Sequence, residues 1–229
     1  MPHHAHRLVD LSHTIRAGLV TYPGLPGPQI TSHLTREASA SHYASGTTFS
    51  IERLTMVGNT GTYLDTARHR YAEGPDLAAL ELDSLVDLPT EVFHLDGATT
   101  RGIGASALAD RDVRGRAVLL HTGWDRHFGT PAYGGDAPFL AADGVRHLFE
   151  AGATLVGIDS VNLDDASAAS GGERPAHSTF LGAGIYVLEH LTNLGALPAS
   201  GARLTVVPPK IEGVGTFPVR AFAAVPAES

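Results

Sequence analysis

Five short apolar runs, each closed by glycine, proline or polar turn residues, constrain the fold of this 229-residue chain more than any other feature. Runs of this length and composition are typical of β-strands. They are EVFHLDG from Glu91, RAVLLHTG from Arg116, ATLVGIDS from Ala153, RLTVVPP from Arg203 and FPVRAFAAV from Phe217. Each run is predicted to form a strand.

Helices are predicted between the strands. In APFLAADGVRHLFEAG, Pro138 stands at a first helical turn and Gly152 is suited to ending the helix. The apolar residues between them fall at helical spacing: Val145, Leu148 and Phe149. A shorter helix is predicted over residues 106–111. Because strands outnumber helices, the pattern favours an α/β fold of mixed layers over a regular doubly wound sheet.

The composition limits the classes of function. Sixteen basic and 24 acidic residues give a net charge of −8, which repels phosphate backbones and anionic lipids. We therefore expect no nucleic acid and no membrane as partners. No apolar run approaches the roughly 20 residues that cross a bilayer, and the N-terminus lacks the apolar core of an export signal, so a cytoplasmic protein is expected. The 43% hydrophobic content suits a single domain over residues 1–229.

The segment from Asn59 to His69, NTGTYLDTARH, concentrates polar residues typical of an active site. If it is extended, Asn59, Tyr63 and Asp65 share one face, because side chains alternate with period two. Gly61 would let a small ligand approach the backbone, Asp65 could bind a divalent cation, and His69 could act as a general base or acid. The alternative is a polar turn in which Asp65 caps a backbone group and His69 lies on the surface.

A second polar pair, His177 and Glu189, lies in otherwise apolar sequence. Glu189 belongs to FLGAGIYVLEHL, which is apolar enough to be buried. A carboxylate buried there is costly unless it is paired or bound to a cation. The alternatives to a cation are an ion pair with an arginine such as Arg220, or an exposed Glu189 at the end of its element.

The chain resembles the cyclase family of metal-dependent hydrolases, which includes bacterial kynurenine formamidases, isatin hydrolases and some polyketide cyclases. The resemblance covers nearly the whole chain in the family's order. It is carried by DLSHTIRAGLVTYPGLP near the N-terminus, the Asn59 segment, HTGWDRHFGT at His121, VGIDSVNLDD at Val156, HSTFLGAGIYVLEHLTNL at His177 and PPKIEGVGTFPVRAFA near the C-terminus.

The family's central motif, HxGTHxDxPxH, is only partly present. The positions that match are Gly61, Thr62, Asp65 and His69. Asn59 and Tyr63 replace the motif's first two histidines, and Ala67 replaces its proline. By resemblance, Asp65, His177 and Glu189 bind a divalent metal and His69 acts in catalysis.

The two lost histidines weaken the implied metal site. Zinc favours imidazole and thiolate ligands, whereas the Asn59 amide and the Tyr63 phenol are poorer ligands at neutral pH. An oxygen-rich set with His177 as its one imidazole suits manganese or magnesium better than zinc. The competing alternative is a protein without metal, in which Tyr63, His69 and the carboxylates perform acid/base chemistry or hold a ligand.

The first functional hypothesis is a hydrolase or cyclase that acts on a small carbonyl substrate such as a formamide, a cyclic amide or a lactone, in the manner of an arylformamidase or an isatin hydrolase. Its metal would be manganese or zinc. Asn59, Thr62 and Trp124 are predicted to contact the substrate, with Trp124 as an apolar wall for an aromatic ring unless it is a core residue.

Two other hypotheses remain open. One is a catalytically silent relative that binds a small molecule or a protein partner through the inherited pocket. The other is a metal-free ring-closing or dehydrating enzyme in which Tyr63 donates a proton to a carbonyl and His69 abstracts one from carbon.

By resemblance, the expected fold is the family's swivelling β/β/α architecture with a central mixed sheet, assembled as a homodimer or homotetramer. Family members often complete the pocket with residues of a neighbouring subunit. The segment around Tyr22 and Pro23 is therefore expected to serve a partner's site.

Overall fold

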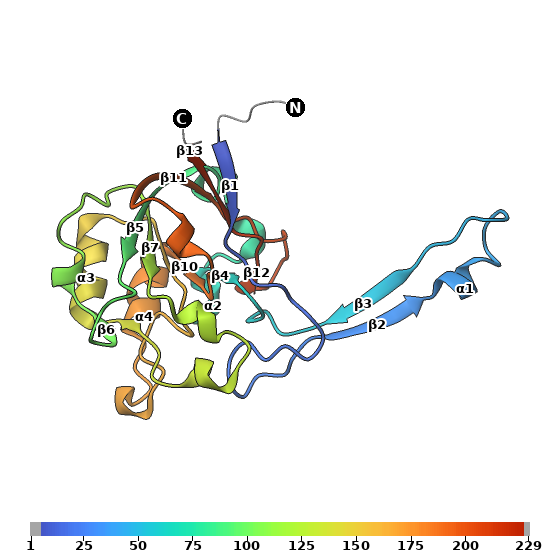
Figure 1. Ribbon diagram of the computed structural model, residues 1–229, viewed down its shortest axis with the longest axis horizontal. Coiled ribbons are helices and arrows are strands. Elements are labelled where there is room, and N and C mark those ends of the chain that lie inside the picture. The colour runs from blue at the N-terminus through green and yellow to red at the C-terminus, as the bar shows by residue number, and fades with distance from the viewer. Residues whose placement is uncertain (1–5, 227–229) are drawn as a thin grey trace.

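A computed structural model describes residues 6–226 of the chain. The described residues form a mixed sheet of nine strands, which curls across the molecule in Figure 1. In spatial order the strands are β1 (His6–Asp10), β13 (Phe222–Pro226), β11 (Ser200–Thr205), β5 (Leu88–His94), β7 (Ala117–His121), β9 (Leu155–Ile158), β10 (Tyr186–Glu189), β4 (Tyr63–Asp65) and β12 (Thr216–Pro218). The β5, β7, β9 and β10 strands run parallel, and the others pair antiparallel. The expected α/β fold with a central mixed sheet is confirmed.

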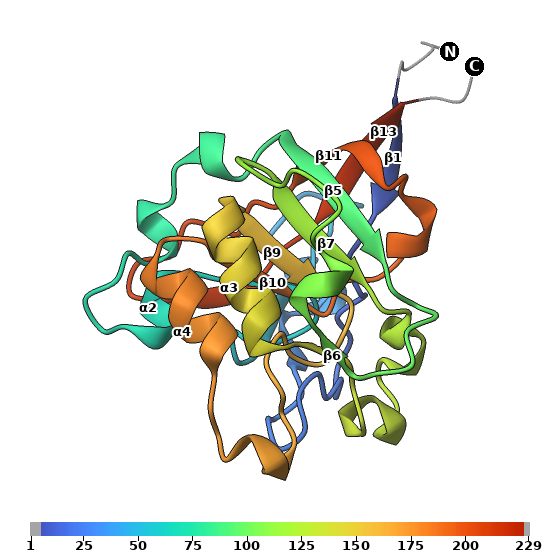
Figure 2. The same cartoon turned by 90° about the vertical axis from the view of Figure 1, so that its left-hand side faces the viewer.

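Both faces of the central strands are buried, which explains their continuous apolar sequences. On β7, Val118 and Leu120 pack in the cluster that also contains residues of the helices α3 (Ala142–Ala151) and α4 (Pro175–Gly182). Leu119, between them, packs in the cluster on the opposite face. Figure 2 shows α3 and α4 in front of the sheet. The helices thus cover one face, and the outer strands curl around the core on the other.

Each of the five predicted strand segments overlaps a strand, and the last overlaps two. FPVRAFAAV divides into β12 and β13 around residues 219–221, because β12 pairs with β4 whereas β13 pairs with β1 and β11. In this short connection the Val219 N–H donates to the Thr62 carbonyl, 2.9 Å away. The chain changes partners there, which a single apolar run does not reveal.

The helix predictions hold in part. Gly152 ends α3 with a φ of 84°, as predicted, but the helix starts at Ala142 and not near Pro138. The preceding residues form β8 (Phe139–Leu140), which pairs in parallel with β6 (Gly102–Ile103) and keeps the backbone extended. The helix predicted over residues 106–111 is wrong. Only a 3-10 turn forms there, because the Ala107 and Leu108 N–H groups donate three residues back.

The remaining elements are short. An arm consists of β2 (Gln29–Leu34), the helix α1 (Arg36–Ser39) and β3 (Ile51–Thr55), and α2 (Ala67–Arg70) follows β4 directly. The 3-10 turns are Leu77–Ala79, Leu82–Ser84, Ala105–Ala107, Trp124–His127, Pro131–Gly134, Ala168–Ser170 and Leu194–Ala196. Over residues 6–226, no helix has the length and apolarity that a membrane span requires.

Candidate metal centre

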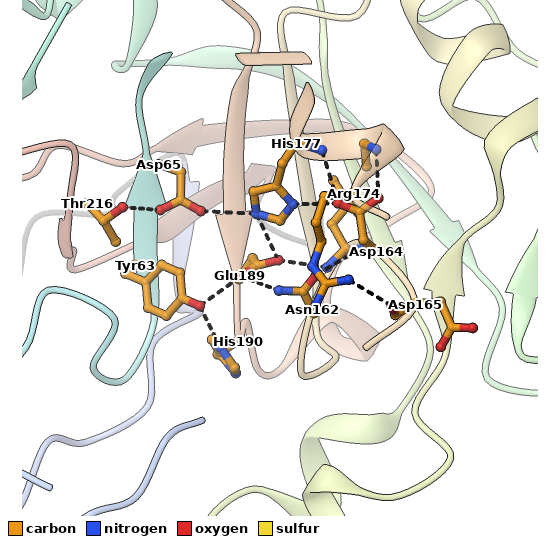
Figure 3. A network of polar contacts seen from close by, with 12 residues as sticks. Tyr63, Asp65, Asn162, Asp164, Asp165, Arg174, His177, Glu189, His190 and Thr216 are labelled. Carbon is orange, nitrogen blue, oxygen red and sulfur yellow. Dashed lines mark hydrogen bonds and ion pairs between the residues drawn. The ribbon is translucent and has the colours of Figure 1, made fainter. Parts of the chain in front are cut away.

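Three side chains from distant segments meet at one end of the sheet. Asp65 comes from β4, Glu189 from the neighbouring β10, and His177 from the first turn of α4 (Figure 3). His177 Nε2 lies 3.5 Å from Asp65 Oδ2 and 3.6 Å from Glu189 Oε1. All three ligand atoms lie within 4.8 Å of one another, and all three residues are buried.

This spacing fits a single metal ion. Two atoms that each lie about 2.1 Å from one ion are roughly 3 to 4 Å apart. Two carboxylates and one imidazole are also a donor set that divalent cations accept. The three residues singled out from the sequence as metal ligands are therefore brought together in a geometry that a cation can occupy.

Asp65 supplies the strongest independent sign of a cation. Its side chain is fully buried, and the Thr216 hydroxyl donates to Oδ1. The other oxygen, Oδ2, is buried without a hydrogen-bond partner anywhere in residues 6–226. The nearest charged group to Oδ2 is His177 Nε2, at 3.5 Å, and a bound cation between them would satisfy this buried oxygen.

Asp164 orients His177. Its carboxylate accepts the backbone N–H groups of Ala176 at 2.6 Å and His177 at 3.1 Å, which caps the start of α4. It also lies 2.7 Å from His177 Nδ1, so that Nδ1 carries the proton and Nε2 faces the other two carboxylates. Burial acts to lower the pKa of His177, but the charge of Glu189 and the bond to Asp164 prevail and raise it well above its ordinary value. A cation would compete with the proton for Nε2.

Glu189 is held through both oxygens. The Leu163 N–H donates to Oε1 at 2.7 Å, while the Tyr63 hydroxyl donates to Oε2 at 2.8 Å. Burial raises the pKa of Glu189 to about 7, against the lowering effect of His177. The alternative of an ion pair with Arg220 is wrong, because Arg220 pairs with Asp10 at 2.7 Å.

Tyr63 begins a buried chain of hydrogen bonds. His190 Nε2 lies 3.1 Å from the Tyr63 hydroxyl, and the Tyr133 hydroxyl lies 2.8 Å from His190 Nδ1. Burial, with the charges of Glu189 and Asp65, raises the pKa of Tyr63 well above its ordinary value. Burial lowers the pKa of His190 to about 3, so the ring is neutral near pH 7.

The centre opens into a cavity of about 310 Å³. The cavity is lined by Tyr22, Leu25, Asn59, Tyr63, His69, Arg70, Asn162, Arg174, His177 and Glu189. His69, at the exposed end of α2, has its ring centroid 6.2 Å from that of His177. The cavity therefore joins two of the candidate metal ligands, His177 and Glu189, to a histidine that solvent can reach.

Two residues predicted to contact substrate lie elsewhere. Trp124 is absent from the cavity lining, and its indole N–H donates to the Tyr133 carbonyl at 2.9 Å in a small aromatic cluster. The Thr62 hydroxyl donates to the His190 carbonyl at 2.5 Å and accepts the His13 N–H at 3.1 Å. Thr62 therefore ties two loops together, and in this chain the alternative of a packed Trp124 fits the structure better than a substrate wall.

Two further expectations need correction. Residues 59–62 are not extended, because Gly61 has a φ of +66° and β4 begins only at Tyr63. A Cβ on Gly61 would lie 2.9 Å from Ile15, so the glycine serves protein packing and not the approach of a ligand. Tyr22 lines the cavity of its own chain, and its service at a partner's site stays a prediction.

The sequence argument did not identify Asp164, His190 or Tyr133. A signal existed for Asp164, because VNLDD is followed by a proline-initiated helix whose N–H groups need an acceptor. His190 follows Glu189 within the same apolar run, which made it a second candidate for a buried polar partner.

Comparisons with known proteins agree with this architecture. Residues 9–165 match the family described as "Putative cyclase". The kynurenine formamidase of Paracidovorax citrulli is 29% identical over 183 residues, covering 77% of this chain and 81% of that protein. The kynurenine formamidase of Geobacillus thermodenitrificans is 28% identical over 201 residues, covering 87% and 90%.

Solved structures show the same fold. Isatin hydrolase A from Labrenzia aggregata, bound to benzyl benzoate, superposes with a TM-score of 0.83 at 23% identity, covering 97% of this chain and 95% of that chain. An isatin hydrolase bound to the product analogue thioisatinate has a TM-score of 0.81 at 22% identity, covering 97% and 94%. The resemblance seen in the sequence is thus confirmed, and the chain belongs to the cyclase family of metal-dependent hydrolases.

Proposed function

We propose that this protein is a metal-dependent hydrolase that cleaves a C–N or C–O bond at the carbonyl of a small substrate. One observation carries the proposal: Asp65 Oδ2, which accepts no hydrogen bond within residues 6–226, converges with His177 Nε2 and Glu189 Oε1 beside a cavity of about 310 Å³. A pocket of this size accepts a one-ring or two-ring molecule.

The donor set fits manganese better than zinc. Asp65 and Glu189 supply carboxylate oxygens and His177 supplies the one imidazole, whereas zinc is commonly held by more nitrogen or sulfur ligands. A divalent cation bound there polarises a carbonyl and lowers the pKa of a water molecule.

His69 is the residue of this chain placed to move the proton. It lies on the cavity wall with an exposed ring. As the oxygen of a water molecule bonds to the substrate carbonyl carbon, His69 takes the released proton. It then donates this proton to the leaving nitrogen or oxygen as the C–N or C–O bond breaks. The products are a carboxylic acid and an amine or alcohol, which remain joined where the substrate was a ring.

The geometry supports the metal-dependent reaction over the metal-free alternative. The alternative needs Tyr63 to protonate a substrate carbonyl, but the Tyr63 hydroxyl donates to Glu189 and burial raises its pKa well above the ordinary value. For the substrate we propose an N-formyl aromatic amine or an isatin-like cyclic amide. The names of the relatives, kynurenine formamidase and isatin hydrolase, support this choice.

The test uses protein purified without a histidine tag. Metal analysis should find a divalent ion, and N-formyl aromatic amines and isatin-like rings should be hydrolysed with added manganese or zinc and not after chelation. Asp65→Asn should lose both metal and activity, whereas His69→Ala should keep the metal and lose turnover.

Two results would reject the proposal. Activity that survives chelation but is lost in Tyr63→Phe and His69→Ala would establish the metal-free enzyme. No bound metal and no turnover with any divalent ion would establish a catalytically silent binding protein.

The cytoplasmic location stays a prediction from the sequence.

A further inference from the structure

Both oxygens of Glu189 are engaged, but unequally. Oε2 accepts the Tyr63 hydroxyl at 2.8 Å and the Asn162 amide at 3.4 Å. Within residues 6–226, Oε1 accepts one hydrogen bond, from the Leu163 N–H at 2.7 Å, and it lies 3.6 Å from His177 Nε2. A carboxylate oxygen has about two lone-pair positions, so Oε2 is saturated and Oε1 keeps one position free.

The hydrogen bond from Tyr63 is fixed in direction by the buried residues behind it. Because Tyr63 donates its proton to Glu189, its oxygen must accept a proton from His190 Nε2. The neutral His190 ring then has a bare Nδ1, which accepts the hydroxyl proton of Tyr133. Every donor in the chain Tyr133, His190, Tyr63 therefore points toward Glu189.

The other carboxylate follows the same pattern. Asp65 Oδ1 accepts the Thr216 hydroxyl, which leaves Oδ2 with no hydrogen bond within the described residues and 3.5 Å from His177 Nε2. A second cation bound beside the first would need another carboxylate or amide oxygen with a free lone pair, so that this oxygen could bridge the two ions. Asn162 cannot supply it readily, because its Oδ1 already accepts the Asp164 N–H at 2.9 Å.

We infer that Tyr63, held in place by His190 and Tyr133, is a positioning residue that confines Glu189 to one-oxygen ligation of a single divalent cation. The protein then contributes three ligand atoms, Asp65 Oδ2, His177 Nε2 and Glu189 Oε1, and leaves the remaining positions to water or substrate. This inference rests on the proposed function, since it requires that the centre binds a metal.

The test measures the bound ion directly. Metal-free protein is titrated with Mn²⁺ by calorimetry, and the visible absorption of bound Co²⁺ reports its coordination number. The wild-type protein should bind one ion per chain. Tyr63→Phe should lower the affinity for Mn²⁺ by roughly 10- to 100-fold, as expected for loss of a residue that orients a ligand. It should also weaken the Co²⁺ absorption, because the freed Oε2 adds a ligand.

Two further variants separate positioning from general damage. Tyr133→Phe does not touch Glu189, but it removes the last donor of the chain and should shift affinity and Co²⁺ absorption in the same direction by a smaller amount. Tyr71→Phe is the matched control. Its hydroxyl donates to the Ser178 carbonyl at 2.8 Å, outside this chain of bonds, so metal binding should not change. If Tyr63→Phe fails to fold, the metal affinity and Co²⁺ absorption of Tyr133→Phe decide whether the inference stands.

The outcomes distinguish the two proposals. Two ions per wild-type chain, or wild-type affinity and Co²⁺ absorption in both Tyr63→Phe and Tyr133→Phe, would overturn the inference while the metal-dependent function stands. No metal binding by the wild-type protein, or binding that Asp65→Asn leaves intact, would overturn the proposed function and the inference with it.

Discussion

His13 carries a residue-level prediction about acid stability. Its ring stacks on Phe128 with centroids 3.6 Å apart, and burial lowers its pKa to about 4 although the charge of Asp125 acts to raise it. In the unfolded chain a histidine titrates near 6.5. Between pH 6.5 and 4 the His13 ring is therefore protonated in the unfolded state and neutral in the folded state. The free energy of unfolding consequently falls as the pH falls. His190, with a pKa of about 3, acts in the same direction.

The measurement is the free energy of unfolding from urea titrations at several pH values between 7.5 and 4.5. Below pH 6.5 the free energy of unfolding of His13→Gln should fall less steeply with pH than that of the wild type. The difference in slope should correspond to up to about one bound proton. His6→Gln is the control, because His6 is exposed and lies outside the arm. Equal slopes in the wild type and His13→Gln would show that His13 is not excluded from protonation in the folded protein.

Gly61 permits a second prediction at this scale. It combines a φ of +66° with a Cβ position 2.9 Å from Ile15. Gly184 has a similar φ, +75°, but nothing lies within 4 Å of its Cβ position. Gly184→Ala should cost about 1 kcal/mol from the left-handed backbone alone. Gly61→Ala should cost more, about 2 to 4 kcal/mol, because crowding adds to the strain. Equal losses in chemical denaturation would mean that Ile15 moves aside freely.

At the scale of elements, the start of α4 joins stability to the metal centre. The Asp164 carboxylate caps the helix and fixes the His177 ring. Asp164→Asn should cost about 1 to 2 kcal/mol through the cap and lower the affinity for a divalent metal by roughly 10- to 100-fold. Both effects come from one carboxylate.

The matched control is Asp165→Asn. Asp165 lies on the same loop, where it accepts from Arg101 at 3.1 Å and from the Ser167 N–H at 3.0 Å, and it makes no contact with α4 through these bonds. Thermal unfolding and metal titration should therefore separate the two variants. If Asp164→Asn bound metal like the wild type, the orienting role of Asp164 would be rejected.

Sequence patterns located most strands but not their partners. The apolar runs at Arg116 and Ala153 became β7 and β9, because burial on both faces leaves a local record in the sequence. The division of the run at Phe217 into β12 and β13 depends on pairing with distant strands. Such pairing is a tertiary property, and periodicity within one run does not encode it.

For the candidate site, the metal ligands were predictable from the sequence, but the residues that hydrogen-bond to them were not. The resemblance to the cyclase family identified Asp65, His177 and Glu189 as a set, and the structure brings them within 4.8 Å. The hydrogen-bond partners Asp164 and His190 were missed, since which groups meet depends on the pairing of β4 with β10 and on the placement of α4.

At the scale of the whole molecule, the arm is the feature that a single chain leaves unexplained. Figure 1 shows β2, α1 and β3 projecting from the rest of the fold. Ile30 and Leu54 lie opposite each other in the β2–β3 register and are 45% and 51% exposed. A two-stranded ribbon alone is marginally stable in water, so this arm needs an apolar surface to cover it. We propose that a second copy of the chain supplies that surface.

A homodimer held by the arm makes a prediction about mass. One chain has a mass of 23.9 kDa, so the wild-type protein should elute at about twice that mass in size-exclusion chromatography with light scattering. Replacing residues 30–54 by a short glycine-serine linker should give a monomer that keeps its thermal unfolding transition, because the central sheet does not include the arm. Ile30→Ser with Leu54→Ser should weaken the dimer, whereas Arg53→Gln, on the opposite face of the same ribbon, should not. A monomeric wild-type protein at micromolar concentration, or a dimer that survives removal of the arm, would contradict this assembly.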